Sequence, residues 1–336
     1  MVVDLRSDTV TKPTAGMLDA MYSAKVGDDV FEEDESINAL EKKTAAIFGM
    51  QAGIFCPSGT MTNQIAIKCF TQPMDELIAD QTAHVYRYEG GGIAFNSAVS
   101  TRLLNAERGI LSAEMIAPEI NADNVHYPHT SLVVLENTVN RGGGSCYTLN
   151  QIIPIAELCK QKGLKLHLDG ARIFNALTKT GDKASEYGAL FNGISVCLSK
   201  GLGAPVGSVL LADFETIKYA RRIRKVLGGG MRQAGFLAAA GIYALDNHIE
   251  RLKDDHNNAQ MLSNILNNCN WVKSIIPVET NIIVFETIEP ANNIIERLAN
   301  YGIKALTTGP YSIRFVLHLD IQPQHMEHIC NSLKLI

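Results

Sequence analysis

Short apolar runs bounded by Gly, Asn or Asp recur through the middle of this chain. They are AGIFCPSG (52–59), DELIAD (75–80), SLVVLEN (131–137), LKLHLDG (164–170), GISVCLSK (193–200) and GSVLLAD (207–213). Several are hydrophobic over nearly their whole length, which is typical of strands that are covered on both faces. The pattern therefore predicts the strands of a buried sheet.

Helical periodicity fills the segments between these runs. Examples are TMTNQIAIKCF (60–70) and LNQIIPIAELCKQKG (149–163). The second segment ends in Lys162 and Gly163, a pair that favours a helix stop. Strand and helix alternate along the chain, and this alternation predicts an α/β fold with a mainly parallel sheet.

The pattern changes towards the C-terminus. One long helical pattern runs from about 231 to 270, followed by NIIVFET (281–287), the helix-like ANNIIERLANYG (291–302), YSIRFVLHLD (311–320) and a last helix. This strand–helix–strand–helix order predicts a smaller α+β domain. We therefore divide the chain into a large domain, residues 1–249 including the N-terminal segment, and a small C-terminal domain, residues 250–336.

The composition fits two globular domains and argues against nucleic-acid binding. The chain has 336 residues, of which 46% are hydrophobic and 19% charged, so it can bury a large core. The formal net charge is −5. One basic cluster, RRIRK at 221–225, is short and lies in a helical pattern, so we expect no nucleic-acid partner.

The cysteines and the N-terminus bear on where the protein works. The seven cysteines show neither a CxxC pair nor a Cys/His zinc spacing, which argues against a disulfide framework and a metal site. The first residues, MVVDLRSDTV, lack the basic-then-apolar pattern of a signal peptide. No apolar run reaches the roughly 18 residues that a membrane helix needs. We expect a cytoplasmic protein with no membrane partner.

Three sets of residues stand where open α/β sheets bind ligands, at the carboxyl ends of strands. The first is CPSGTMTNQ (56–64), a tight turn that leads into a helix with Ser58, Gly59 and Thr60 at its start. Free backbone N–H groups and hydroxyls at a helix N-terminus form an anion site, and phosphate is the obvious anion. A simple helix cap explains the same residues without a ligand.

The second set is Asp169 and Arg172, within KLHLDGARI (165–173). A carboxylate at the end of a buried strand needs a cationic partner. Arg172 could be that partner in a private salt bridge, and Asp169 could also be no more than a turn residue. A ligand cation is the functional alternative.

The third set is Lys200, within LSKGLGAPVG (198–207) and between two apolar runs. A lysine in this setting is expected to reach solvent with difficulty, and a buried ammonium costs several kcal/mol unless it is paired or neutral. A surface loop with Lys200 pointing outward is the other interpretation.

Pyridoxal 5'-phosphate (PLP) asks for these three sets together. Its phosphate sits at a helix N-terminus, an acid keeps its pyridine nitrogen protonated, and a lysine amine holds its aldehyde as a Schiff base. The acid is then Asp169, and the lysine is Lys200, which must be neutral to attack. Arg172 would be free to bond the phenolate oxygen of the cofactor.

Eight segments together resemble one enzyme family, the low-specificity L-threonine aldolases, which belong to the aspartate-aminotransferase-like (fold type I) PLP enzymes. The segments are DLRSDTVTKPT (4–14), GDDVFEEDESINALE (27–41), CPSGTMTNQ (56–64), HVYRYEGGG (84–92), LENTVNRGGGSCYTL (135–149), HLDGARIFNA (167–176), SKGLGAPVGSVL (199–210) and LGGGMRQAG (227–235). The resemblance implies a large domain with a mainly parallel seven-stranded sheet. It also implies retro-aldol cleavage of L-threonine or L-allo-threonine to glycine and acetaldehyde.

The resemblance also assigns histidines and an acid to the site. His84 matches the histidine that stacks on the pyridine ring, and Glu89 matches an acid near the cofactor. His126, in NVHYPHT, resembles the histidine placed near the β-hydroxyl of the substrate. Without the resemblance, His84 would be read as a polar loop residue and His126 as a surface residue. Either histidine could be the base that removes the hydroxyl proton.

Further residues are assigned to substrate and phosphate. Ser7 and Arg314 resemble the groups that bind the substrate carboxylate, and a guanidinium matches a carboxylate bidentately. Lys225 and Arg232 resemble residues that reach the phosphate from a neighbouring subunit, although a solvated basic helix face is the alternative. A shared site implies a homo-oligomer, expected to be a dimer of dimers. Phe31 departs from the family, since relatives often carry Tyr there.

The resulting prediction is a PLP-dependent aldehyde-lyase whose catalytic residues are Lys200, His84, His126 and Asp169. A β-eliminating lyase is the nearest rival, because it also needs a base near Cβ. Other fold type I PLP enzymes and a non-catalytic PLP-binding paralogue are further alternatives. A binding module has no need of the lysine. A NAD-linked dehydrogenase is disfavoured because no GxGxxG follows the first strand.

Overall fold

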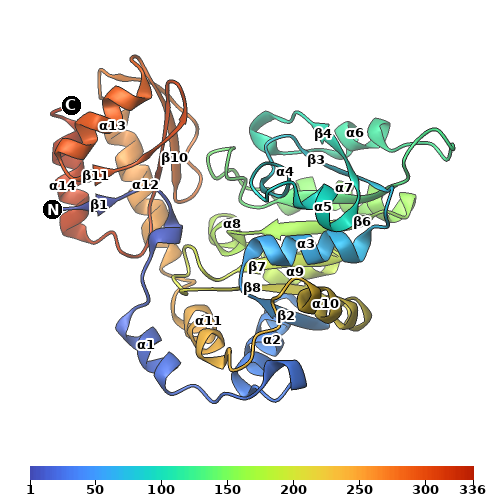
Figure 1. Cartoon of the computed structure of the whole chain (residues 1–336). Helices are drawn as coiled ribbons and strands as arrows, with labels where there is room; N and C mark the ends of the chain where they lie inside the picture. The colour runs from blue at the N-terminus through green and yellow to red at the C-terminus, as the bar shows by residue number, and fades with distance from the viewer.

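The computed structural model describes residues 1–336, and its larger part is built on a seven-stranded sheet (Figure 1). In spatial order the strands are β2 (Ala52–Cys56), β8 (Ser208–Ala212), β7 (Gly193–Cys197), β6 (Lys165–Gly170), β5 (Thr130–Glu136), β3 (Glu76–Asp80) and β4 (Ser100–Leu104). Neighbours run parallel except at β8, which is antiparallel to both β2 and β7. The predicted α/β class and mainly parallel sheet are confirmed.

Each of the six apolar runs forms a strand of this sheet. The pattern missed the seventh strand, β4, which reads STRLL. This strand lies at the edge of the sheet, and only its last residue is buried. The other edge strand, β2, is covered by α2 and α10 and keeps its apolar run, whereas β4 is mostly open to solvent and therefore carries polar residues.

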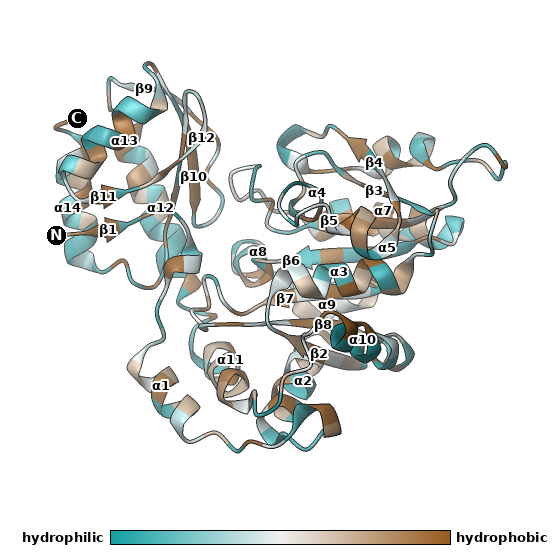
Figure 2. Cartoon of the chain, in the orientation of Figure 1, coloured by the Kyte–Doolittle hydropathy of each residue, from teal (hydrophilic) through white to brown (hydrophobic).

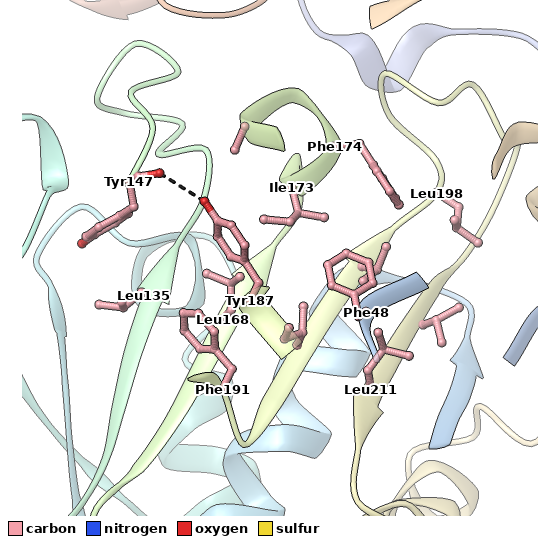
Figure 3. Close-up of a cluster of buried hydrophobic side chains, with 14 of the residues drawn as sticks. Phe48, Leu135, Tyr147, Leu168, Ile173, Phe174, Tyr187, Phe191, Leu198 and Leu211 are labelled. Carbon is pink, nitrogen blue, oxygen red and sulfur yellow. Dashed lines mark hydrogen bonds between the residues drawn. The ribbon is translucent and has the colours of Figure 1, made fainter. Parts of the chain in front are cut away.

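Two hydrophobic cores cover the two faces of the sheet. The first lies against α2 (Glu35–Phe48), α7 (Leu149–Lys162), α8 (Ile173–Thr180), α9 (Ala184–Leu190) and α11 (Gly235–Asn247), and it also receives α1 (Ala15–Tyr22) and α6 (Ala113–Ile116). Figure 3 shows its buried aromatic rings, among which the Tyr187 hydroxyl donates to the Tyr147 carbonyl at 3.3 Å. The second core lies under α3 (Gly59–Phe70), α4 (His84–Arg87), α5 (Gly92–Ser97) and α10 (Phe214–Val226).

Strand alternation decides which residues face α3. Leu166 and Leu168 of β6 belong to the first core. His167 and Asp169 therefore point to the opposite face, because successive side chains of a strand alternate. On that face both contact Asn63 of α3.

The long helical pattern predicted over 231–270 is wrong as a single helix. The structure has two helices, α11 (Gly235–Asn247) and α12 (Leu252–Leu266). Between them the His248 ring turns inward, where its Nδ1 lies 2.7 Å from the Leu202 carbonyl oxygen. The two helices pack mainly into different hydrophobic cores, and the hydrophobic periodicity of the sequence does not reveal such a change of packing partner.

The smaller part is α+β, as predicted. Its antiparallel sheet has the order β12 (Leu306–Gly309), β13 (Ser312–Val316), β10 (Ile282–Thr287) and β9 (Val272–Ile275). The helices α12, α13 (Ala291–Asn300) and α14 (Pro323–Leu333) pack with this sheet around a separate core. In Figure 2 strands of both sheets carry brown, hydrophobic residues, whereas surface helices such as α10 show a teal side.

The N-terminal strand lies with this smaller part. β1 (Val3–Asp4) pairs in parallel with β11 (Ile303–Lys304), and Val3 and Leu5 are buried in the C-terminal core (Figure 1). Short 3₁₀ helices are η1 (Asp8–Val10), η2 (Asp29–Phe31), η3 (Glu107–Gly109) and η4 (Ala117–Glu119). The pairing brings residues 5–8 to the junction of the two parts, while the division at 249/250 stays a prediction.

No helix of the structure combines the length and the apolar character that a membrane span requires.

Candidate active site

Four of the predicted residues, together with Glu136, gather at one edge of the large sheet. Ser58 follows β2, His84 follows β3 and Lys200 follows β7. Glu136 ends β5 opposite Asp169, which is close to the end of β6. These strands are parallel to one another, so the edge is formed by their carboxyl ends, as open α/β sheets require of a ligand site.

The turn after β2 has the features of an anion site. Ser58 caps α3, and its hydroxyl accepts from the Met61 N–H at 3.2 Å. This leaves the N–H groups of Gly59 and Thr60 free at the helix N-terminus. The buried Ser208 hydroxyl has no hydrogen-bond partner, and a Cβ on Gly59 would lie 3.4 Å from it. The cap and the anion site therefore coexist in the same residues.

Asp169 is a buried carboxylate without a cation beside it. Its side chain accepts hydrogen bonds from the Asn63 amide at 2.9 Å and from the Ala171 N–H at 3.1 Å. The residue is 3% exposed. The private salt bridge with Arg172 is wrong, because Arg172 binds another carboxylate.

That carboxylate is Asp8, from the N-terminal segment. Arg172 donates to it through Nε at 2.7 Å and through Nη2 at 2.8 Å, and both side chains are buried. Asn281, at the start of β10, donates to the same carboxylate at 3.3 Å. Burial alone would raise the pKa of Asp8, but Arg172 holds it at about 2. Nη1 of Arg172 keeps its hydrogens for a ligand, so the predicted cofactor contact is compatible with this pair.

We expect Asp8→Asn to destabilise the protein by about 3 kcal/mol, since removing one charge strands Arg172 in a buried site. The low pKa of Asp8 means that its stabilisation is complete above about pH 4 and is lost as the pH falls towards 2. Urea unfolding at neutral pH measures the effect. Asp246→Asn, which breaks the exposed Lys43–Asp246 pair, is the matched control. Equal losses for the two variants would contradict the expectation.

Lys200 is less enclosed than its sequence context suggested. It is half-buried and forms no ion pair. Its carbonyl accepts from the Gly203 N–H at 2.8 Å and from the Thr11 hydroxyl at 3.3 Å, which fixes the turn that carries it. Its ammonium acts on the pKa values of Asp8 and His84. Lys200 therefore lies in the site with an unpaired amine.

The Glu89 carboxylate accepts hydrogen bonds from several side chains, including the His84 ring. It accepts from the Asn63 amide at 2.9 Å and from the Gln64 amide at 2.7 Å, and its Oε1 lies 3.0 Å from His84 Nδ1. Its side chain is fully buried, whereas that of His84 is 29% exposed. A carboxylate accepts hydrogen bonds, so Nδ1 of His84 carries a hydrogen. Nε2 is then free to contact a ligand.

The surroundings of His84 act on its protonation. Burial is the largest influence and lowers the pKa, but the hydrogen bond to Glu89 and the charge of Asp169 outweigh it. The pKa of His84 is therefore raised above its ordinary value, although Lys200 acts in the opposite direction. His84, Glu89 and Asp169 also place ligand atoms within 4.8 Å of one another, but the absence of a metal stays a prediction.

Glu136 joins His84 to Asn140, whose side chain in turn bonds Arg314 of the small domain. Its carboxylate accepts from the His84 N–H at 2.8 Å and from the Asn140 N–H at 2.9 Å. Burial and the neighbouring charge of Asp169 raise the pKa of Glu136 to about 7. The segments that contain His84 and Asn140 are therefore both held by the one buried carboxyl group of Glu136.

Arg314 reaches the site from β13 of the small domain. It donates to the Asn140 side chain at 2.8 Å and to the Arg6 carbonyl at 3.0 Å. The adjacent Ser7 caps η1. Burial and the nearby Arg172 lower the pKa of Arg314, and its Nε has no partner. Ser7 and Arg314 thus lie together, and an anion between the domains would relieve the cluster of positive charge.

Three predicted residues do not join this group within one chain. His126 is exposed on the loop before β5, at the opposite edge of the sheet from Asp169. The strand between them is roughly 20 Å long. Lys225 and Arg232 are exposed around the end of α10, where Arg232 pairs with Asp28 at 2.8 Å. Their proposed roles therefore need another copy of the chain.

Family comparison agrees with this geometry. The model of a family described as beta-eliminating lyase matches residues 4–289. The chain belongs to the beta-eliminating lyase family. It is therefore an enzyme, and all eight segments that carry the resemblance noted in the sequence lie within the matched residues.

Individual relatives in this family are similar over nearly their full length. A probable low-specificity L-threonine aldolase 2 of Arabidopsis thaliana is 39% identical over 99% of this chain and 97% of its own. A low specificity L-threonine aldolase of Escherichia coli (strain K12) is 37% identical over 98% and 97%. The solved threonine aldolase of Leishmania major has a TM-score of 0.87 at 22% identity and covers 99% of this chain and 98% of its own, which confirms the fold.

The sequence analysis missed several residues of this site. They are Asp8, Asn63, Gln64, Glu136, Asn140 and His167. Most act through partners that are distant in sequence, which no local pattern reveals. The one available signal was alternation in β6, which places His167 on the same face as Asp169.

Proposed function

We propose that this enzyme cleaves L-threonine and L-allo-threonine to glycine and acetaldehyde, with PLP as cofactor. The observation that carries the proposal is the combination of a buried carboxylate without a cation, Asp169, and an unpaired lysine, Lys200, at one sheet edge. The names of the relatives from A. thaliana and E. coli support the substrate.

The residues present fit PLP. Ser58, Gly59 and Thr60 offer hydroxyls and free N–H groups to a phosphate, and the orphaned Ser208 hydroxyl adds a donor beside them. Asp169 would hold the ring nitrogen, and Lys200 would hold the aldehyde carbon. When bound, PLP supplies an electron sink for the bond that breaks at the substrate Cα.

The chain itself would orient the substrate. Arg314 and Ser7 would hold the substrate carboxylate and so would restrict how the substrate turns about its Cα. Arg172 stays in place because Asp8 occupies its Nε and Nη2, so Nη1 can donate to the cofactor. Asn140 and Glu136 keep Arg314 and His84 in fixed relation across the domain junction.

His84 is the better-placed base within one chain. The Glu89 carboxylate holds the Nδ1 hydrogen, so Nε2 is free to take the β-hydroxyl proton. The raised pKa of His84 makes it a stronger base than an ordinary histidine. His126 would take this role only from a neighbouring copy, directly or through water.

We expect Glu89→Gln to shift the acid limb of the activity profile to lower pH by roughly 0.5–1 unit. The base form of His84 is the active one, and loss of the Glu89 charge removes a cause that raises its pKa. Glu136 titrates in the same range but is unchanged between the two proteins, so the comparison isolates His84. Measurement of kcat/KM between pH 5.5 and 9 decides; a shift to higher pH would exclude His84 as the base.

We also propose a homo-oligomer, a dimer of dimers, in which Lys225 and Arg232 reach the phosphate of a neighbouring copy. Two large apolar side chains support a contact there, since Phe31 is 69% and Val226 is 86% exposed close to these residues. Phe31 would then lie at the shared site, where it could affect the threo/erythro preference. The seven unpaired cysteines support a cytoplasmic location.

One assay tests the reaction. Purified protein is given PLP and then L-threonine or L-allo-threonine, and acetaldehyde, glycine, 2-oxobutanoate and ammonia are measured. We expect acetaldehyde and glycine in equal amounts. Formation of 2-oxobutanoate and ammonia instead would identify the protein as a β-eliminating enzyme, and no product with bound PLP would favour a non-catalytic paralogue.

A further inference from the structure

Asn63 lies between the two buried carboxylates of the site. It is in the second turn of α3 and is 1% exposed. Its amide nitrogen donates to Glu89 Oε1 and to Asp169 Oδ2, both at 2.9 Å. Two negative groups are therefore joined by the two hydrogens of one neutral amide.

These contacts fix which way the Asn63 amide points. An amide has two hydrogens on nitrogen and none on oxygen. In the reversed orientation the oxygen would face both carboxylates, and no hydrogen would lie between any of them. The Asn63 oxygen must therefore point away from Glu89 and Asp169, and there it meets His167.

His167 is fully buried on β6, two residues before Asp169 and on the same face of the sheet. Its Nε2 lies 3.1 Å from Asn63 Oδ1, and its Nδ1 lies 3.0 Å from the Gly193 carbonyl oxygen. Both neighbours are acceptors. A ring with a single hydrogen can donate to only one of them, and only a hydrogen on Nε2 lets His167 hold the Asn63 amide in its orientation.

We propose that Asn63 and His167 are positioning residues that hold the Glu89 and Asp169 carboxylates in register. The hydrogen on His167 Nε2 locks the Asn63 amide, and the locked amide supplies the hydrogens that keep the two carboxylates close together. This proposal rests on the proposed function in one respect, since it takes Asp169 as the partner of the cofactor ring. The hydrogen-bond arrangement itself does not depend on the reaction.

The position of the hydrogen can be measured without activity. In purified protein with ¹⁵N-labelled histidine, multiple-bond ¹H–¹⁵N spectra report which ring nitrogen is protonated. The signal of His167 among the nine histidines is assigned by its loss in His167→Gln. A hydrogen on Nε2, with or without a second one on Nδ1, supports the proposal. A hydrogen on Nδ1 alone overturns it.

A pair of substitutions at His167 tests the consequence for the cofactor. Gln places its amide nitrogen near the position of Nε2, so it can still donate to Asn63, whereas Asn places it near Nδ1 and can reach only Gly193. We expect His167→Asn to weaken PLP binding about tenfold, the loss of one hydrogen bond in a charged network. His167→Gln should stay within about threefold of the wild type.

Substitutions in α3 complete the test. Asn63→Leu removes both hydrogens without adding charge, and we expect it to weaken PLP binding at least as much as His167→Asn. Thr71→Val, at the far end of the same helix, removes a buried hydroxyl that touches only the Ile67 carbonyl and serves as the control. Equal PLP affinities of His167→Gln and His167→Asn, or of Asn63→Leu and Thr71→Val, would overturn the positioning role. If wild-type protein binds no PLP, the proposed function fails while the spectra still decide the arrangement.

Discussion

Lys200→Ala should lower threonine cleavage by more than about a thousandfold and remove the visible absorbance that PLP acquires on a protein amine. The turn that carries Lys200 is fixed, since the Lys200 carbonyl accepts from the Gly203 N–H and the Thr11 hydroxyl. The loss should fall on kcat and on cofactor retention together. Absorbance spectra of the purified protein and an acetaldehyde assay measure the two effects.

The control is an exposed lysine of the same domain. Lys218, on α10, has no part in the site, so Lys218→Ala should keep both the visible absorbance and the activity. A far-ultraviolet circular dichroism spectrum establishes that each variant is folded. If folded Lys200→Ala protein kept the absorbance band, the assignment of the cofactor to this lysine would be wrong.

The fold was predictable from sequence where residues are buried on both faces. Six strands of the large sheet appear as apolar runs because helices cover both of their sides. The edge strand β4 carries Ser, Thr and Arg and was missed. The break between α11 and α12 was missed because both helices keep a continuous periodicity while their partners change.

Site residues were predictable from sequence where the chemistry of the cofactor requires a particular residue type. Residues whose role is to bind other site residues were not predictable. Lys200 and Asp169 follow from the chemistry of PLP, whereas His84 and Arg314 needed the family resemblance. The Asp8–Arg172 pair joins positions 164 residues apart, and it exists because the N-terminal strand pairs with β11. No local pattern carries such a contact.

Asp169→Asn should lower kcat by roughly 100- to 1,000-fold, with a smaller change in KM for threonine. The electron sink requires a protonated ring nitrogen, and a carboxylate favours that proton by its charge. An amide has no charge to offer, and its N–H would favour the unprotonated ring. Arg314 and Ser7 are untouched by the substitution, so substrate binding should be largely retained.

Strand β3, which is separated from β6 by β5, provides a matched control for this prediction. Asp80 ends β3 as a buried carboxylate, and its oxygens accept from the N–H groups of Thr82 and Ala106, so its contacts are structural. Asp80→Asn should cost stability yet leave the kcat of the folded protein within about threefold. Steady-state kinetics and PLP titration of both variants distinguish two effects: loss of the Asp169 charge beside the cofactor, and the general effect of changing a buried carboxylate. A kcat for Asp169→Asn close to that of Asp80→Asn would mean that Asp169 supports the sheet edge and that the ring proton is held by another group.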